Sequence, residues 1–167
     1  MKHDALAAEI IAMRDRDQAM RHKAIAGTAS YDHDLDRAHT ERLRAIVDEI
    51  GWPSRSSVGD VAEHAAWLLA QHAIHDIAFQ KRCLALMQNE PPSEVCAEHL
   101  AYLEDRIATG EGRPQRFGTQ LRGAPRTGFE PAELADPEHV DELRASFGLE
   151  PLADYLSGAA VALRKDG

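Results

Sequence analysis

The segment that follows Gly59 constrains the fold more than any other part of the chain, because its helical faces are apolar nearly all the way round. An apolar arc at helical spacing predicts a helix here, formed by Val61, Ala65, Leu69 and Ala73. A helix of this kind is usually covered by other helices rather than lying on the surface. We therefore expect a long helix at the centre of the domain.

Two polar residues interrupt this apolar pattern. His72 and Asp76 lie four residues apart, so on one continuous helix they would share a face in the middle of the apolar arc. A charge-capable pair in such a place needs an explanation, because burying it without partners is costly. The carboxylate could accept a hydrogen bond from one imidazole nitrogen and leave the other free as a general base. The sequence therefore predicts a His72–Asp76 dyad.

The rest of the chain also favours helices. Hydrophobic residues make up 44% of the 167 residues and aromatic residues only 5%, which is typical of close-packed helices. We predict a mainly α, compact multi-helix domain, a single domain over residues 1–167, with about six helices and a short extended or hairpin segment near residues 113–122. The expected helices cover about residues 4–26, 40–50, the segment after Gly59, 93–107, 136–147 and 151–163. We expect a connector at residues 27–38, with a charged continuation of helix as the alternative, and a loop at residues 123–133.

The formal net charge of −9 limits the partners of the chain. No cluster of lysine and arginine stands free of acidic neighbours, so the electrostatic field should repel nucleic acid and anionic membranes. No apolar stretch approaches the roughly 20 residues that span a bilayer, and the first residues lack the apolar core of a signal peptide. Cys83 and Cys96 have no C-x-x-C spacing and predict neither a disulfide framework nor a zinc knuckle. We expect a cytoplasmic protein that binds a small-molecule ligand.

An ordered set of short motifs runs through most of the chain: Gly51-Trp52-Pro53, Val58-Gly59, Trp67-Leu68-Leu69-Ala70-Gln71-His72-Ala73, Asp76, Phe79-Gln80, Ala101-Tyr102-Leu103-Glu104-Asp105-Arg106 and Gln115-Arg116-Phe117-Gly118-Thr119-Gln120. From about Met13 to Tyr155, this set resembles the signature of a bacterial family catalogued as domain of unknown function 6624. The chain has Ile74 and Phe117 where members often have aspartate and tyrosine, which puts any role of those groups in doubt. The resemblance implies positions for a site and no activity.

Further polar residues are candidates for the same site. Asp17 falls on the apolar stripe of the expected first helix, with Arg21 one turn later. Arg106 offers a planar fork that could anchor an anionic ligand, or it could form a salt bridge with Asp17 or Asp105. The segment from Gln115 to Gln120 could contact a substrate or instead close a turn. The candidate substrate-binding residues are Arg106, Gln71, Gln80, Gln120, Thr119, Gln115, Asp105, Asp17 and Trp52.

These residues suggest a polar pocket between the central helix, the first helix and the segment from Asp105 to Gln120. The leading interpretation is a cofactor-independent enzyme for a small polar metabolite, with His72 as general acid/base and Asp76 as orienter. Hydrolysis, elimination and isomerisation all stay open. One alternative is a metal-dependent enzyme in which His72 and Asp76 are ligands, and another is a non-catalytic binding or interaction module. His64 and His75 project on a different arc and are not assigned to the site.

Overall fold

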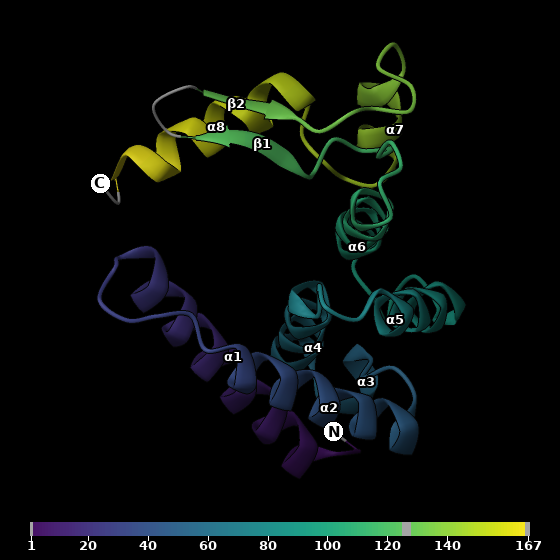
Figure 1. The fold of residues 1–167 in the computed structure, drawn as a ribbon. Helices are drawn as coiled ribbons and strands as arrows, with labels where there is room; N and C mark the ends of the chain where they lie inside the picture. The colour runs from purple at the N-terminus through teal and green to yellow at the C-terminus, as the bar shows by residue number, and fades with distance from the viewer. Residues whose placement is uncertain (1, 125–127, 166–167) are drawn as a thin grey trace. The chain divides into compact units, whose positions relative to one another are not determined.

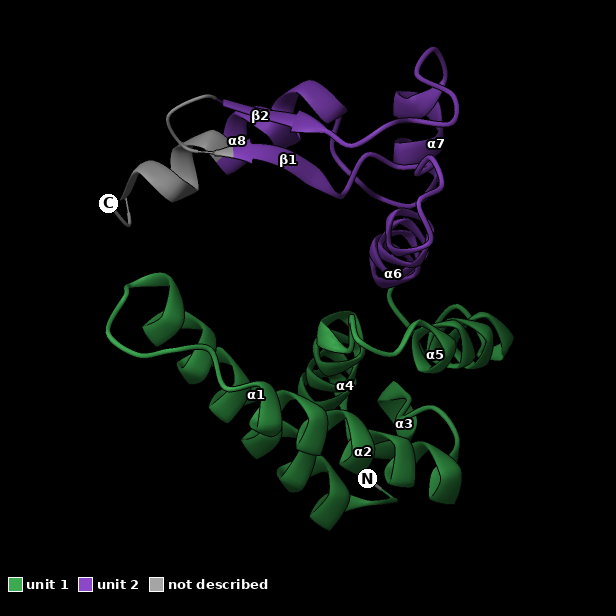
Figure 2. Cartoon of the chain, viewed as in Figure 1, with its two compact units in different colours: residues 1–96 green, residues 97–167 purple. Residues whose placement is uncertain are grey.

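A computed structural model describes residues 2–124 and 128–165. In these residues, eight helices and one two-stranded antiparallel sheet follow one another along the chain (Figure 1). The mainly α fold expected from the sequence is confirmed. The chain forms two compact units, residues 1–96 and 97–167, which are described in turn (Figure 2). The organisation of residues 1–167 as a single domain stays a prediction.

Unit 1 is built around one short helix. It contains α1 (Asp4–Ile25), α2 (His33–Ile50), α3 (Arg55–Val58), α4 (Asp60–His72) and α5 (Ile77–Asn89). Helix α4 packs against α1, α2, α3 and α5. Its Ala65, Ala66 and Ala70 are fully buried, and such small side chains let neighbouring helices approach closely. The central helix expected from the apolar pattern is therefore α4.

The expected long helix is interrupted after His72. Helix α4 ends there, and Asp76 caps the start of α5, where its Oδ1 accepts a hydrogen bond from the backbone N–H of Phe79 at 2.9 Å. The prediction that His72 and Asp76 share a face of one helix is wrong. The physical reason is that an aspartate side chain satisfies an otherwise unpaired N–H at a helix start, and here this effect outweighs the apolar periodicity.

Helix α2 begins earlier than expected. The side chain of Asp32 accepts hydrogen bonds from the backbone N–H groups of Asp34 and Leu35, so Asp32 rather than Thr40 is the N-cap. The Thr40 hydroxyl instead donates to the carbonyl oxygen of Asp36 inside the helix. The connector expected at residues 27–38 is thus confined to residues 26–32. The earlier start places Asp36 on a helix that packs against α1 (Figure 1).

Unit 2 contains α6 (Ala97–Gly110), β1 (Leu121–Ala124), β2 (Gly128–Pro131), α7 (Val140–Ser146) and α8 (Leu152–Lys165). The two strands pair antiparallel, with Leu121 opposite Pro131, and α8 packs against β2. The loop expected at residues 123–133 is therefore wrong in part. Gly123 explains the difference, because it has φ +110° and a Cβ there would lie 2.1 Å from the Gly128 carbonyl oxygen. A glycine that normally indicates a loop here permits close strand pairing.

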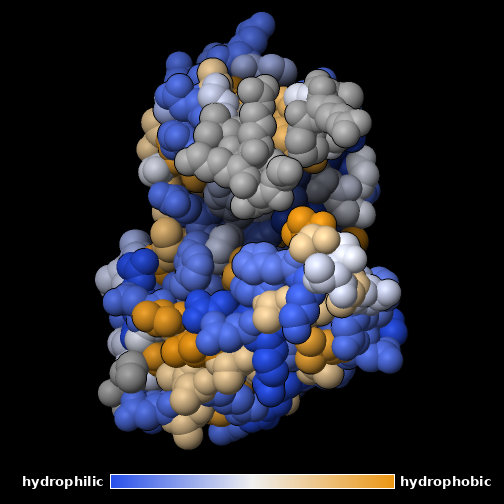
Figure 3. Space-filling view, turned by 90° about the vertical axis from the view of Figure 1, so that its left-hand side faces the viewer, coloured by the Kyte–Doolittle hydropathy of each residue, from blue (hydrophilic) through white to orange (hydrophobic). Residues whose placement is uncertain are grey.

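The surface of the described residues is mostly polar. Figure 3 shows one face on which hydrophilic residues predominate and hydrophobic residues form smaller patches. The large apolar side chains exposed in the described part are Ile25, Val61 and Ile74. The inward position expected for Val61 is therefore wrong. None of the helices in the described ranges is both long and apolar enough to cross a bilayer.

Candidate functional site

A buried carboxylate, Asp17, lies at the centre of the polar residues of unit 1. Its side chain, on α1, is only 1% exposed. The Nδ1 atom of His72, at the end of α4, lies 2.6 Å from Asp17 Oδ2. Arg21, one turn further along α1, donates from Nε to both oxygens of Asp17 at 3.0 and 3.1 Å. The carboxylate is therefore held between an imidazole and a guanidinium.

The same guanidinium connects Asp17 to a second carboxylate on α2. Arg21 donates from Nη2 to Asp36 Oδ1 at 2.8 Å, and His75 Nδ1 lies 3.4 Å from Asp36 Oδ2. Arg21 thus connects two histidine–aspartate pairs, and the contacts run in the order His72, Asp17, Arg21, Asp36 and His75. We call these five residues the charge network. Most of it is shielded from water, with Asp36 9% and Arg21 20% exposed at the side chain.

The electrostatics of Asp17 decide the direction of its hydrogen bond with His72. Burial raises the pKa of Asp17, but the hydrogen bond and charge of His72 and the charge of Arg21 outweigh it and hold that pKa below its usual value of 3.8. Asp17 is then an ionised acceptor near neutral pH, so His72 donates its Nδ1–H. Whenever the ring is neutral, its Nε2 atom carries a lone pair. It makes no hydrogen bond or ion pair with any residue in the described ranges, and the side chain is 18% exposed.

A third histidine, His39, lies on α2 beside the network. It is buried, and neither ring nitrogen has a hydrogen-bond partner among residues 2–124 and 128–165. Burial lowers the pKa of His39, and the charge of Asp17 opposes this effect without reversing it. The ring is therefore held neutral in an environment that does not solvate its cation.

The neutral state of His39 predicts a loss of stability in mild acid. Because the folded-state pKa lies below 6.5, the unfolded chain takes up the proton first, so stability is fully present above pH 6.5 and falls as the pH drops below it. His39→Gln should lessen the fall in urea midpoint between about pH 7.5 and about pH 5.5. His22→Gln, at an exposed position on α1, is the control and should retain the wild-type fall. An equal fall in His39→Gln and wild type would contradict the effect.

A pocket of about 520 Å³ adjoins the charge network in unit 1. It shares Arg21, Asp36 and His75 with the network, and the carbon of the Arg21 guanidinium lies 5.3 Å from the centre of the Tyr31 ring. Burial raises the pKa of Tyr31, and the charge of Asp36 adds to that effect, so its phenol remains protonated. The residues that line this pocket are Arg21, Tyr31, His33, Asp36, Arg37, Ile74 and His75.

The structure gives Asp76 a different role from the one expected. Besides capping α5, its Oδ2 accepts a hydrogen bond from Arg44 of α2. The hydrogen bond from the backbone of Phe79 lowers the pKa of Asp76, and the side chain of Arg44 lowers it further. No hydrogen bond or ion pair joins Asp76 to His72 in the described part of the chain. The expected contact between Asp76 and His72 is therefore wrong, and the carboxylate in contact with His72 is Asp17.

Three other predicted residues of unit 1 lie in its core. Gln80 of α5 donates from Nε2 to the carbonyl oxygens of Ala70 and Gln71 at 3.0 and 3.2 Å, which satisfies the end of α4 across the break. Gln71 and Trp52 are each 2% exposed. The amide of Gln80 therefore stabilises the turn that presents His72.

The predicted residues of unit 2 hold a loop together. Asp105 on α6 is fully buried and accepts hydrogen bonds from the backbone N–H groups of Arg116, Phe117 and Thr119 and from the Thr119 hydroxyl, at 2.8 to 3.0 Å. Gln115 donates from Nε2 to the carbonyl oxygens of Gln120 and Ala132 at 2.9 Å. These contacts support the turn-closing alternative for this segment.

Further hydrogen bonds of this segment come from other residues of unit 2, as from Arg144 to the Phe117 carbonyl oxygen and from Tyr155 to that of Thr119. Gln120 Nε2 donates to the Thr119 hydroxyl, and Arg106 lies partly buried on α6. Asp17, which was a possible partner of Arg106, binds Arg21. The polar pocket expected between α1, α4 and the segment from Asp105 to Gln120 involves both units and stays a prediction.

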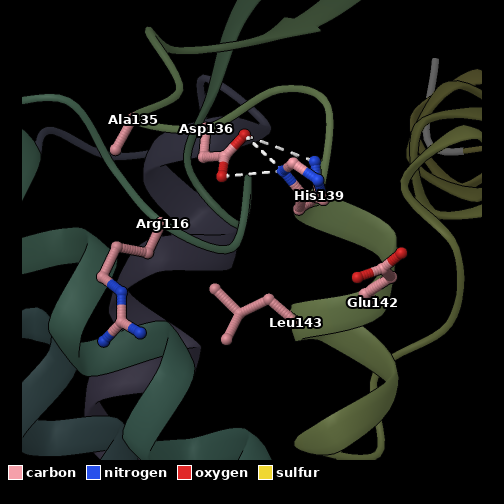
Figure 4. A pocket seen from close by; sticks show the side chains of 6 residues that line it. All are labelled: Arg116, Ala135, Asp136, His139, Glu142 and Leu143. Atoms are coloured by element: carbon pink, nitrogen blue, oxygen red, sulfur yellow. Dashed lines mark hydrogen bonds and ion pairs between the residues drawn. The ribbon is translucent and has the colours of Figure 1, made fainter.

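Unit 2 has a pocket of its own, of about 450 Å³ (Figure 4). Figure 4 shows Asp136 and His139 facing one another across its rim, with His139 Nδ1 3.0 and 3.1 Å from the two carboxylate oxygens. The hydrogen bond from His139 lowers the pKa of Asp136. Both side chains are more than 60% exposed, and ion pairs in water are weak and mobile. The buried network of unit 1 is therefore the better candidate site.

Comparison with known protein families agrees with the resemblance drawn from the motifs. The model of a family of unknown function, DUF6624, matches residues 4–163. The chain belongs to the DUF6624 family. Searches of curated proteins and of solved structures found no match. For this DUF6624 protein, the chemistry rests on the geometry of its own residues.

The sequence of this DUF6624 protein did not identify Asp36 and His75 of the charge network, nor the neighbouring His39. Asp36 and His39 lie three positions apart on α2, a spacing that would indicate one helical face if residues 33–38 were taken as helix. His75 was set aside because it does not share an arc with His72 on a straight helix, whereas the break after α4 removes that constraint. In the described ranges, no three His, Cys, Asp or Glu side chains are grouped so that they could hold a metal ion.

Proposed function

We propose that this DUF6624 protein is an enzyme that acts on a small polar metabolite by general acid–base chemistry. His72 is the proton-transfer group, and Asp17 is the carboxylate that orients it. The observation that carries the proposal is the 2.6 Å contact between His72 Nδ1 and Asp17 Oδ2, at a carboxylate that is 1% exposed. A buried ionised partner is the arrangement that a histidine base needs.

The arrangement suits repeated proton transfer. When Nε2 takes a proton from the substrate or from water, Asp17 stabilises the imidazolium, and Arg21 keeps Asp17 ionised so that the proton stays on the ring. A positioned acid–base group of this kind contributes about 10²- to 10⁴-fold to a rate. Hydrolysis, elimination and isomerisation all use such a step. The proposal requires no cofactor.

The partner and location are proposed on composition. A net charge of −9 supports a small-molecule substrate over nucleic acid or an anionic membrane. Cys83 and Cys96 are both free thiols, which suits a reducing compartment such as the cytoplasm. Burial raises the pKa of the Cys83 thiol to about 12, so Cys83 is a core residue and not a nucleophile.

The test compares metabolite consumption by wild type and His72→Gln. Each is incubated with a fractionated pool of polar metabolites, and depletion is followed by mass spectrometry. Wild type should deplete at least one compound, and His72→Gln should deplete it about 10²- to 10⁴-fold more slowly. His22→Gln, a histidine exposed on α1, is the matched control and should act as wild type.

The same assay distinguishes a second candidate function. The charge network satisfies its own Asp17 and Asp36 within unit 1, which also suits a non-catalytic binding module. A compound retained by wild type but never converted would favour that function. Equal depletion by wild type and His72→Gln would contradict the role of His72.

A further inference from the structure

Two arginines line the pocket beside the charge network, although the chain as a whole is negatively charged. Its wall contains two guanidinium groups, Arg21 and Arg37, against the single carboxylate of Asp36, together with two histidines. The chain carries a net charge of −9. Because Asp17 and Asp34 also pair with Arg21 and Arg37, the pocket has no net positive charge, and an anion there would be held by hydrogen bonds from the guanidinium groups.

The donors of this pocket are only partly used by the protein. Arg21 binds Asp17 through Nε and Asp36 through Nη2, and its Nη1 makes no hydrogen bond within the described residues. Two contacts to carboxylates hold the guanidinium in one orientation, so the entropy lost on binding a ligand is small.

The pocket also has an apolar wall. Ile74 is 59% exposed, which is unusual for a large aliphatic side chain, and it lies in the lining together with the ring of Tyr31. The Tyr31 ring is 4.7 Å from that of His33 and lies beneath the Arg21 guanidinium. An inorganic ion would leave this surface uncovered, whereas an organic anion would cover it.

We propose that this pocket binds the substrate, and that the substrate is a small organic monocarboxylate. Its carboxylate faces Arg21 and Arg37, and its apolar part covers Ile74 and Tyr31. A single negative charge fits better than a double one, because Asp36 lies in the same wall. The assignment of the ligand as substrate rests on the proposed function, since His72 lies two residues before Ile74 and shares the network with Arg21.

Phenylacetate is the probe, and phenylacetamide is its neutral counterpart of the same shape. Binding to the full chain is followed by NMR through the methyl groups of Ile74. Phenylacetate should bind at least about 10-fold more tightly than phenylacetamide, and inorganic phosphate should bind more weakly than phenylacetate. Equal binding of acid and amide, tighter binding of phosphate, or no binding of phenylacetate at millimolar concentration would overturn the proposal.

Two matched arginine variants locate the site. Arg37 and Arg113 have side chains 61% and 59% exposed, and each forms an ion pair with a nearby acid. Arg37→Gln should weaken phenylacetate binding about 3- to 10-fold, and Arg113→Gln, outside the pocket, should leave it unchanged. An equal loss of phenylacetate affinity in both variants would show a general effect of charge and would overturn the assignment of this pocket as the binding site.

Binding and turnover can fail separately. If phenylacetate does not bind but His72-dependent depletion of a metabolite occurs, the proposed substrate class is wrong and the proposed enzymatic function is supported. If phenylacetate binds as expected but wild type converts no compound, the pocket stands as a carboxylate-binding site and the enzyme proposal fails.

Discussion

Asp17→Ala is expected to lower the free energy of unfolding by about 2–4 kcal/mol. The carboxylate is 1% exposed and binds His72 and Arg21, so its removal leaves an imidazole and a guanidinium beside a buried gap. Arg21 keeps Asp36 as a partner, which limits the loss. Urea denaturation of the full chain measures the change.

Asp15→Ala is the matched control, because Asp15 lies on the same helix with its side chain 63% exposed. This variant should change the free energy of unfolding by less than about 0.5 kcal/mol. Equal losses in the two variants would contradict the buried role of Asp17.

The pH dependence of Asp17→Ala gives a second readout. The folded-state pKa of Asp17 lies below its usual value of 3.8, so its stabilisation is present above that pH and is lost as the pH falls through the lowered pKa. Asp17→Ala should therefore flatten the acid end of the stability curve. An unchanged acid end would show that the carboxylate contributes nothing in its ionised form.

Asp105→Ala is expected to lower the free energy of unfolding by about 3–5 kcal/mol. The side chain is fully buried, and it accepts hydrogen bonds from three backbone N–H groups and the Thr119 hydroxyl. Without it, these donors lose their acceptor in a part of the loop that excludes water. Hydrogen exchange should show faster exchange at the amides of Phe117 and Thr119.

Glu104→Ala provides the comparison at the neighbouring position. Glu104 is 25% exposed and forms an ion pair with Arg116 at 2.7 Å. The substitution therefore removes a carboxylate from the same turn of α6 but leaves the hydrogen bonds of Asp105 to the loop in place. Its loss should be no more than about 1 kcal/mol, and the amides of Phe117 and Thr119 should keep their protection. Loss of that protection in Glu104→Ala as well would contradict the special role of Asp105.

The helices of unit 1 could be predicted where apolar periodicity and end signals agree. Helix α1 ends at Ile25, next to its expected end, and α2 ends at Ile50, before Gly51 with φ +74°. Where a single side chain sets a boundary, periodicity fails. Asp32 starts α2 early and Asp76 starts a new helix, because the carboxylate of each accepts a hydrogen bond from a backbone N–H at the helix start. The apolar periodicity does not register this contact.

The hairpin of unit 2 was predicted only in part, because the expected extended or hairpin segment near residues 113–122 overlaps β1 at its end, whereas residues 128–131 were expected in a loop. Gly123 indicates a loop in the sequence, yet its missing Cβ permits the close approach between β1 and β2. The pattern of the candidate site was predicted in part: His72 and Asp17 were both identified as polar intrusions on apolar helix faces. Asp36 and His75 were not identified, because their positions beside Arg21 depend on where α2 begins and where α4 ends.

The sequence by itself determined that the chain is mainly helical, that the segment after Gly59 is central, and that His72 and Asp17 each need a partner. These conclusions follow from helical period and from the cost of burying unpaired polar groups. Only the tertiary structure decided that His72 and Asp17 are each other's partner across 55 positions of sequence. The packing of α1 against α4 brings them together, and no local spacing encodes which helix docks on which.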